Sequence, residues 1–155
     1  MWKSKLDEML PLLGHRNWIL VVDKAFPLQS AAGMTYLNSG ESIDKVLDYV
    51  LSEIKHQSHI KPVIYTDKEL EVLSQIGEEE TEMVQLLNNT LSNYEVNSIL
   101  HDKVFEKLDT ASKLFNVVVI KTESTIAYSS VFIELDCGYW TASKESKLRE
   151  LVANL

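Results

Sequence analysis

Two side chains that could do chemistry near neutral pH flank a short apolar run near the start of the chain. His15 precedes the run from Trp18 to Val22, and Asp23 follows it. A histidine can take up or release a proton near pH 7, and a carboxylate can accept hydrogen bonds from two donors. Turns and strand ends also collect polar residues for solubility alone, so His15 and Asp23 could instead be surface residues with no catalytic role.

The run between these residues sets the distance that separates them. It is short, rich in β-branched and aromatic residues and bounded by turn chemistry, which predicts a buried strand. Five residues at about 3.3 Å each hold the two ends roughly 17–20 Å apart. His15 and Asp23 therefore serve different sites, or a neighbouring copy of the chain brings them together.

The other histidines are weaker candidates. His101 opens the predicted helix that precedes the fifth predicted strand, where polarity at a helix start would explain it as well. His56 and His59 have a spacing that a metal ion would accept, but an exposed polar helix end explains them more simply. We therefore predict no metal site.

Several chemistries lack the residues they need. A strand-end Asp followed by a second carboxylate two residues later would indicate a phosphatase of the haloacid dehalogenase class, but Ala25 stands at that second position. Neither Gly-x-Gly-x-x-Gly nor Gly-x-x-x-x-Gly-Lys-Ser/Thr occurs, so no dinucleotide or nucleoside triphosphate site is predicted. We expect no cofactor.

Apolar spacing alternates along the chain between the helix and the strand period. It predicts helices at residues 3–13 and 41–56, a helix opened by the acidic run 78–80, and a helix around 104–114. Thr66-Asp67-Lys68-Glu69 has the form of a capping box that starts one more helix. Strands are predicted at 18–22, 62–65, about 95–100, 115–122 and 130–136.

This alternation predicts an α/β fold, a three-layer α/β/α domain with a mostly parallel sheet of about five or six strands. The stretch Phe26–Glu41 has no period and directly follows Asp23. Long loops inside compact domains are often functional, and ligands of such sheets bind beyond the carboxyl ends of the strands. Asp23 and this loop therefore mark the expected edge of a site, although a surface loop or an oligomer contact fits the same stretch.

Composition limits the class of protein. The 155 residues predict one domain, and 45% apolar with 25% charged residues is ordinary for a globular protein. The net charge of −8 argues against nucleic acid and anionic membrane surfaces as partners. With one cysteine, no secretory signal pattern and no apolar run near 20 residues, the expected location is the cytoplasm.

Two stretches carry a family resemblance. Gly14-His15-Arg16-Asn17, the apolar run, Asp23 and Phe26-Pro27 form the first, and 115–123 with 128–133 form the second. Over about residues 6–138 the chain resembles the ribose pyranase and fucose mutarotase (RbsD/FucU) family. It departs from the family pattern at Ser130, where an Asn is usual, and at Thr122-Glu123, where a Gly between the two is missing.

The resemblance implies a cofactor-independent sugar mutarotase or pyranase, in which His-assisted acid–base chemistry opens the ring of a monosaccharide. On this basis His15, Asp23 and Tyr128 would be catalytic, and Ser130, His101 and Lys107 would bind the substrate. It also implies a homo-oligomer, a ring of ten subunits with sites between them. A non-catalytic sugar-binding or regulatory protein on the same scaffold is the alternative, which the change at Ser130 keeps open.

Residues 141–155 extend past the region of resemblance. Leu148, Leu151, Val152 and Leu155 follow helical spacing, with an N-cap candidate at Thr141 or Ser143. Because so short a helix is marginal alone, we expect it to dock on the body or on a neighbouring subunit, near Trp140 and beside Tyr128.

Overall fold

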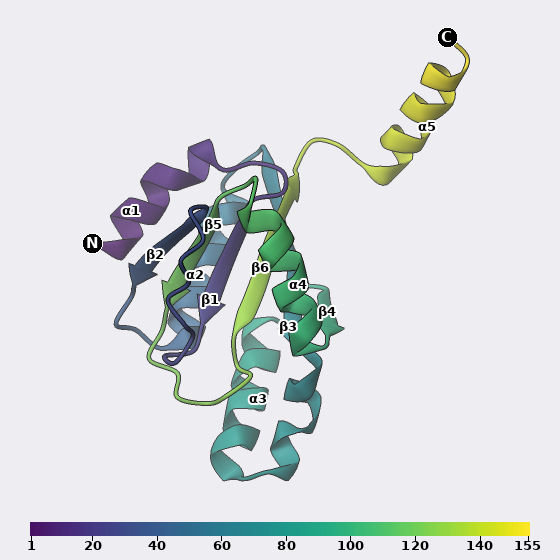
Figure 1. Cartoon of the computed structure of the whole chain (residues 1–155). Helices are drawn as coiled ribbons and strands as arrows, with labels where there is room; N and C mark the ends of the chain where they lie inside the picture. Colours follow the sequence, from purple (N-terminus) through teal and green to yellow (C-terminus); the bar gives the residue numbers. More distant parts are fainter.

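A computed structural model describes residues 1–155 as a six-stranded sheet with helices on both faces (Figure 1). The strands run in the order β2-β5-β1-β6-β3-β4. Their bounds are β1 Trp18–Val22, β2 Met34–Asn38, β3 Ile60–Asp67, β4 Val96–Ile99, β5 Val117–Lys121 and β6 Val131–Cys137.

Only β6 runs against its neighbours. It pairs antiparallel with β1 and with β3, whereas the β1–β5, β2–β5 and β3–β4 pairs are parallel. The predicted mostly parallel α/β sheet is therefore confirmed. Because β6 is reversed, its first residues lie at the edge where the parallel strands end.

One face of the sheet carries most of the helices. These are α1 Trp2–Met9 with the 3₁₀ helix η1 Leu10–Leu12, α2 Ile43–Lys55, the 3₁₀ helix η2 Lys68–Gln75 and α3 Glu78–Thr90. The apolar stripe of α2 is buried along its whole length, as its spacing predicts. It packs in one core with Ile19 and Val21 of β1 and with α1.

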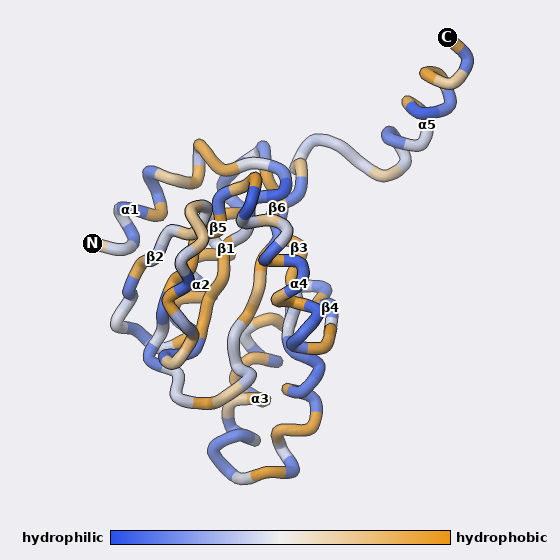
Figure 2. Tube along the Cα trace, in the orientation of Figure 1, coloured by the Kyte–Doolittle hydropathy of each residue, from blue (hydrophilic) through white to orange (hydrophobic).

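The opposite face is covered by one helix, α4 His101–Ser112. Val104 and Leu108 of α4 pack on Trp18, Leu20 and Phe132 of the sheet. Figure 2 shows the apolar strands between polar outer segments. The two outer layers predicted from the sequence are thus present but unequal, since a single helix forms the second.

Two local predictions were wrong. The stretch Phe26–Glu41 is not loop throughout, because β2 lies within it and pairs with β5. No capping box forms at 66–69, since Thr66 and Asp67 belong to β3 and the 3₁₀ helix η2 follows without a side-chain cap. Instead, Glu69 accepts a hydrogen bond from the backbone N–H of His101, 3.1 Å away.

The C-terminal helix α5, Ala142–Ala153, forms as expected and is capped by Thr141, whose hydroxyl accepts from the backbone N–H of Lys144. It buries no residue and projects away from the body (Figure 1). The expected docking on the chain's own body, beside Tyr128, is therefore not observed. A contact with a neighbouring subunit stays a prediction.

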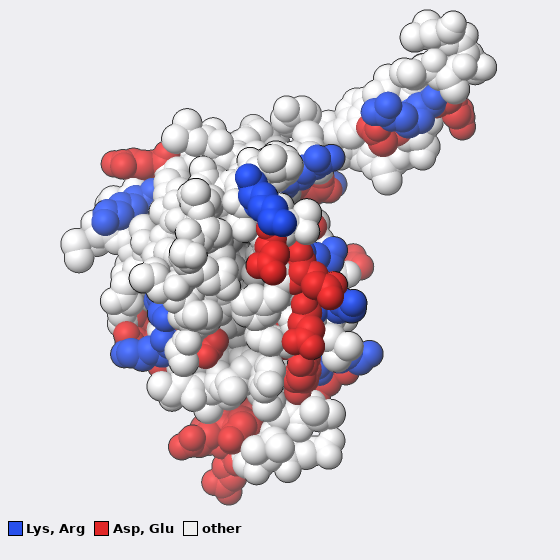
Figure 3. Space-filling view, in the orientation of Figure 1, with Lys and Arg blue, Asp and Glu red and all other residues white.

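The surface is predominantly acidic. Figure 3 shows acidic side chains gathered over α4, which carries Asp102, Glu106 and Asp109. Lys103 and Lys107 of the same helix offset two of these three acidic charges, so most of the net charge of −8 lies elsewhere on the chain. None of the helices has both the length and the apolar character needed to cross a bilayer.

Two Leu→Ala substitutions test which helices pack on the body, because only a buried leucine contributes strongly to the free energy of unfolding. Leu108 of α4 is 1% exposed and Leu151 of α5 is 56% exposed. We expect Leu108→Ala to lower the free energy of unfolding by about 2–5 kcal/mol and Leu151→Ala to change it by no more than about 0.5 kcal/mol in urea titrations. A comparable loss for Leu151→Ala would mean that α5 packs on another surface.

Candidate functional site

Polar side chains from four parts of the chain meet at the edge where the parallel strands end. Asp23 follows β1, Asp67 ends β3, and His101 starts α4 directly after β4. Tyr128 and Ser130 come from the loop that leads into β6. Because β6 is reversed, this loop reaches the same edge as the carboxyl ends of β1 and β3. Ligands of open α/β sheets usually bind at such an edge.

The central pair is His101 and Asp67. His101 Nδ1 lies 2.8 Å from Oδ2 of Asp67, and the carboxylate is completely buried while the imidazole stays partly exposed. The hydrogen bond occupies Nδ1, so Nε2 is the ring nitrogen that can exchange a proton with a ligand. Glu69 fixes the start of α4 by accepting from the His101 backbone, which also fixes the imidazole.

Asp67 is held in an unfavourable environment for a charge. Its Oδ1 is buried and has no hydrogen-bond partner. Burial raises the pKa of Asp67 to about 6; the hydrogen bond and the charge of His101 oppose this shift, and the nearby carboxylates of Glu69 and Asp23 add to it. A hydroxyl donor that reached Oδ1 would satisfy the unpartnered oxygen.

Asp23 and Ser130 form a closed pair beside this group. The Ser130 hydroxyl donates to Asp23 Oδ1 at 2.7 Å and accepts from the Asp23 backbone N–H at 3.0 Å. Ser130 is buried, so its hydroxyl serves to hold Asp23. The carboxylate keeps its second oxygen for other donors.

Tyr128 is held in an uncommon backbone conformation. Its φ is +62°, in the left-handed region that non-glycine residues rarely adopt. Its ring meets the His101 ring edge-on, with centroids 5.3 Å apart. A hydrogen bond between the Ser124 and Ser129 hydroxyls closes the loop on itself, and the Thr122 hydroxyl donates to the Val22 carbonyl at the end of β1. Strain of this kind persists where the surroundings enforce it, often at functional sites.

His15 lies at the other end of the sheet. Its Nδ1 is 3.1 Å from Oδ1 of Asp136, near the end of β6, and Lys61 Nζ is 3.9 Å from the second oxygen of that carboxylate. Asp23 is bonded to Ser130, next to the start of the same strand. The predicted separation of His15 and Asp23 within one chain is therefore observed.

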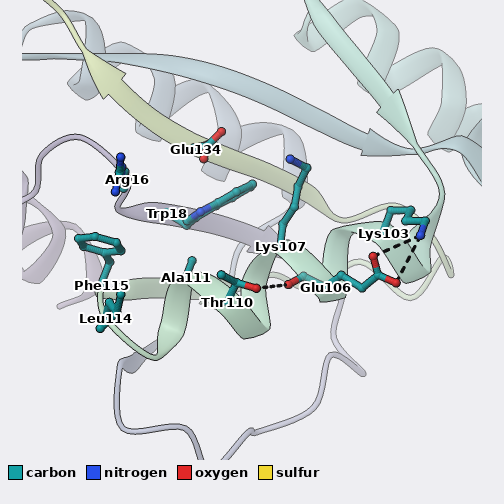
Figure 4. Close-up of a pocket in the computed structure, with 10 residues that line it drawn as sticks. All are labelled: Arg16, Trp18, Lys103, Glu106, Lys107, Thr110, Ala111, Leu114, Phe115 and Glu134. Atoms are coloured by element: carbon teal, nitrogen blue, oxygen red, sulfur yellow. Dashed lines mark hydrogen bonds and ion pairs between the residues drawn. The ribbon is translucent and has the colours of Figure 1, made fainter.

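Lys107 does not join the residues around His101. It lines a separate cleft of about 610 Å³ between α4 and the sheet, where Trp18 and Glu134 form the opposite wall (Figure 4). Its Nζ lies 5.6 Å from the ring centre of Tyr65. The structure thus brings together Asp23, His101, Tyr128 and Ser130 of the predicted site residues, and it separates His15 and Lys107 from them.

Asp67 is the residue that sequence analysis missed as part of a site. Its local pattern resembles that of Asp23, since both are carboxylates at the end of a short β-like stretch, although Thr66 separates Asp67 from the apolar residues. The capping-box interpretation assigned it to a helix start instead. The common pattern at the ends of two parallel strands was the available signal.

The arrangement suits proton transfer to and from a polyhydroxylated ligand. It offers a partly exposed imidazole on a buried carboxylate, a phenol at its edge and a second carboxylate. No three or more His, Cys, Asp or Glu side chains lie in an arrangement that could hold a metal ion.

Comparisons with known proteins place the chain in a family. The model of the RbsD / FucU transport protein family matches residues 1–138. A D-ribose pyranase of Thermosipho africanus (strain TCF52B) is 25% identical over 135 residues, 86% of this chain and 91% of that protein.

Solved structures share the fold. Bacillus subtilis RbsD complexed with D-ribose superposes with a TM-score of 0.61 at 19% identity, covering 86% of this chain and 92% of that one. The fucose mutarotase of Streptococcus pneumoniae in complex with L-fucose gives 0.58 at 17% identity, covering 85% and 91%. Residues 139–155 lie beyond the family match.

The buried carboxylate predicts an unusual pH dependence of stability. The pKa of Asp67 is about 6 in the folded chain against an ordinary value of 3.8, so the folded state holds an extra proton between these values. Stability from this group is present below about pH 4 and is lost as the pH rises through 6. Asp67→Asn cannot ionise, so its unfolding free energy relative to the wild type should rise by about 2 kcal/mol between pH 4 and pH 7.5.

Urea titrations at several pH values measure this difference. The exposed Asp109 provides the matched control, and Asp109→Asn should show a flat difference. A flat difference for Asp67→Asn as well would contradict the raised pKa.

Proposed function

Because the chain belongs to the RbsD/FucU transport protein family, we propose that it is a sugar pyranase or mutarotase that interconverts ring forms or anomers of a monosaccharide. The observation that carries this proposal is the His101–Asp67 pair beside Tyr128 and Asp23, at the sheet edge. Relatives named as a D-ribose pyranase and a fucose mutarotase support a free sugar as the substrate class.

The reaction needs one proton removed and one delivered, and no redox change. A base takes the proton of the anomeric hydroxyl, whose oxygen forms the carbonyl with C1 as the bond from C1 to the ring oxygen breaks. The electron pair of that bond stays on the ring oxygen, which an acid protonates. Reclosure on the other carbonyl face gives the other anomer, and attack by a different hydroxyl gives another ring size. The protein's own groups suffice, so the proposal includes no cofactor.

Histidine suits both roles because its proton affinity lies near neutrality. In our proposal His101 exchanges a proton through Nε2, with Asp67 holding Nδ1. Tyr128 donates to the ring or anomeric oxygen, and Asp23 accepts from sugar hydroxyls. Ser130 keeps the Asp23 carboxylate in place, which is a positioning role.

His15 enters this proposal through a second copy of the chain. It carries its own carboxylate partner, Asp136, at the opposite edge of the sheet. A site that used both His15 and His101 would need two subunits. The end of the sheet that carries His15 in one subunit would have to face the end that carries His101 in its neighbour. We therefore propose a homo-oligomeric ring, of ten subunits by family resemblance, with sites between subunits.

Exchange spectroscopy by NMR on a panel of free aldoses tests the activity directly. The protein should accelerate interconversion of at least one sugar, and His101→Ala and His15→Ala should each lower the rate about 10²–10⁴-fold, the range of a lost acid–base group. His56→Ala is the control, since His56 is an exposed residue at the end of α2, and its rate should not change. Sugar binding without exchange in the wild type would favour a binding protein instead.

Mixed oligomers test whether the site is shared. When His15→Ala and His101→Ala subunits are combined at equal amounts and reassembled, random assembly leaves about a quarter of shared sites with both histidines. Exchange should return to about that fraction of the wild-type rate. If each site lay within one subunit, the mixture would stay inactive.

Light scattering tests the assembly itself. The ring predicts a mass near ten times that of the 17.7 kDa chain at micromolar concentration. A single-chain mass would overturn both the ring and the shared site.

A further inference from the structure

A second cleft lies where the chain leaves the sheet. It has a volume of about 650 Å³, in the size range of small-molecule sites. One wall comes from the body, at the His15 turn and the end of β6, and the other comes from residues 139–145, beyond the family match. Six of its lining residues carry the argument: His15, Lys61, Asp136, Tyr139, Trp140 and Glu145.

The outer wall starts from a fixed point. The Gly138 N–H donates to the His59 carbonyl at 3.0 Å. A Cβ at Gly138 would lie 2.8 Å from the Ser58 carbonyl oxygen, closer than side chains tolerate. Only glycine allows this close approach, which anchors the following aromatic pair, Tyr139 and Trp140, beside the body.

Trp140 is the exposed tryptophan of the chain. It is 38% exposed, whereas Trp2 and Trp18 are 7% and 2% exposed. Its indole N–H donates to Glu145 at 2.6 Å, and Arg149 holds the other oxygen of that carboxylate at 2.8 Å. The same contacts lower the pKa of Glu145, first through Arg149 and then through Trp140. An apolar ring is thus held in place on the wall of a polar cleft.

The inner wall carries the polar groups. His15 Nδ1 lies 3.1 Å from Oδ1 of Asp136, so Nε2 is the ring nitrogen on the side away from this carboxylate. The Asp136 carboxylate also accepts from the Cys137 backbone and lies near Lys61. A sugar has polar hydroxyl edges and apolar C–H faces, and this cleft presents carboxylate, ammonium and imidazole opposite an aromatic ring.

We propose that the segment after Gly138 supplies a wall of the sugar site at His15, in which Trp140 stacks on a C–H face of the sugar. This proposal rests on the proposed function and adds a specificity residue that the family region does not contain. Asp136 and Lys61 bind hydroxyls at the edge of the ring. In the proposed ring this cleft meets the Asp23–Ser130 pair of a neighbouring copy, and the stack adds affinity there because Ser130 replaces the amide of the family pattern and is already bonded to Asp23.

Exchange kinetics on the full chain separate this role from catalysis. Trp140→Ala should raise the sugar concentration for half-maximal exchange about tenfold and leave the maximal rate within about threefold, because the stack holds sugar and transition state equally. Trp140→Phe should give a half-maximal sugar concentration between those of the wild type and Trp140→Ala, since it keeps an aromatic face. Leu151→Ala is the control on the same tail, outside the cleft, and should behave as wild type.

Tryptophan fluorescence gives a second readout that does not depend on turnover. Because the other two tryptophans are buried, titrations with the aldoses of the same panel should include at least one that changes the emission of the wild type and leaves that of Trp140→Phe unchanged. If Trp140→Ala exchanges the sugar normally and its half-maximal sugar concentration is unchanged, the proposed role of Trp140 is wrong and the proposed function is unaffected. If the wild type exchanges no sugar but its emission still changes through Trp140, Trp140 binds sugar and the proposed enzymatic function is wrong.

Discussion

The reversed strand β6 is the constraint on which the arrangement of polar groups depends. It lies between β1 and β3 and pairs with both in antiparallel register. Its first end therefore meets the carboxyl end of β1, where Ser130 binds Asp23, and its last end meets the turn before β1, where Asp136 binds His15. One strand thus supplies a partner to each polar end of another. A parallel strand in this position would exchange the two ends and break both pairs.

A buried charge is the second determinant, because it is costly unless it is paired. Asp67 is the one fully buried carboxylate of the chain, and one of its oxygens has no hydrogen-bond partner. His101 offsets part of this cost and gains a fixed ring orientation in return. The buried Asp67 carboxylate therefore lowers the stability of the fold at this end of the sheet. Titratable groups held at such a cost are common at functional sites.

Most of the fold could be predicted from periodicity, because burial imposes it directly. The stripe of α2 and the run of β1 are buried residue by residue as their patterns require. β2 was missed because its sequence, Met-Thr-Tyr-Leu-Asn, is only partly buried at the sheet edge and carries little alternation. Asp67 was missed because local capping chemistry and a strand end share the same residue types, and only the long-range pairing of β3 with β4, in which Asp67 lies opposite Ile99, decides between them.

The chemistry itself limits how the two histidines could cooperate. The anomeric and ring oxygens are bonded to the same carbon, so the groups that exchange protons with them must both lie within hydrogen-bond reach of that one position. Within one chain His101 and Tyr128 meet this condition, with ring centres 5.3 Å apart, whereas His15 lies at the opposite end of β1. An intrasubunit site would rest on His101 and Tyr128 alone, and any role for His15 in the same step requires that second copy.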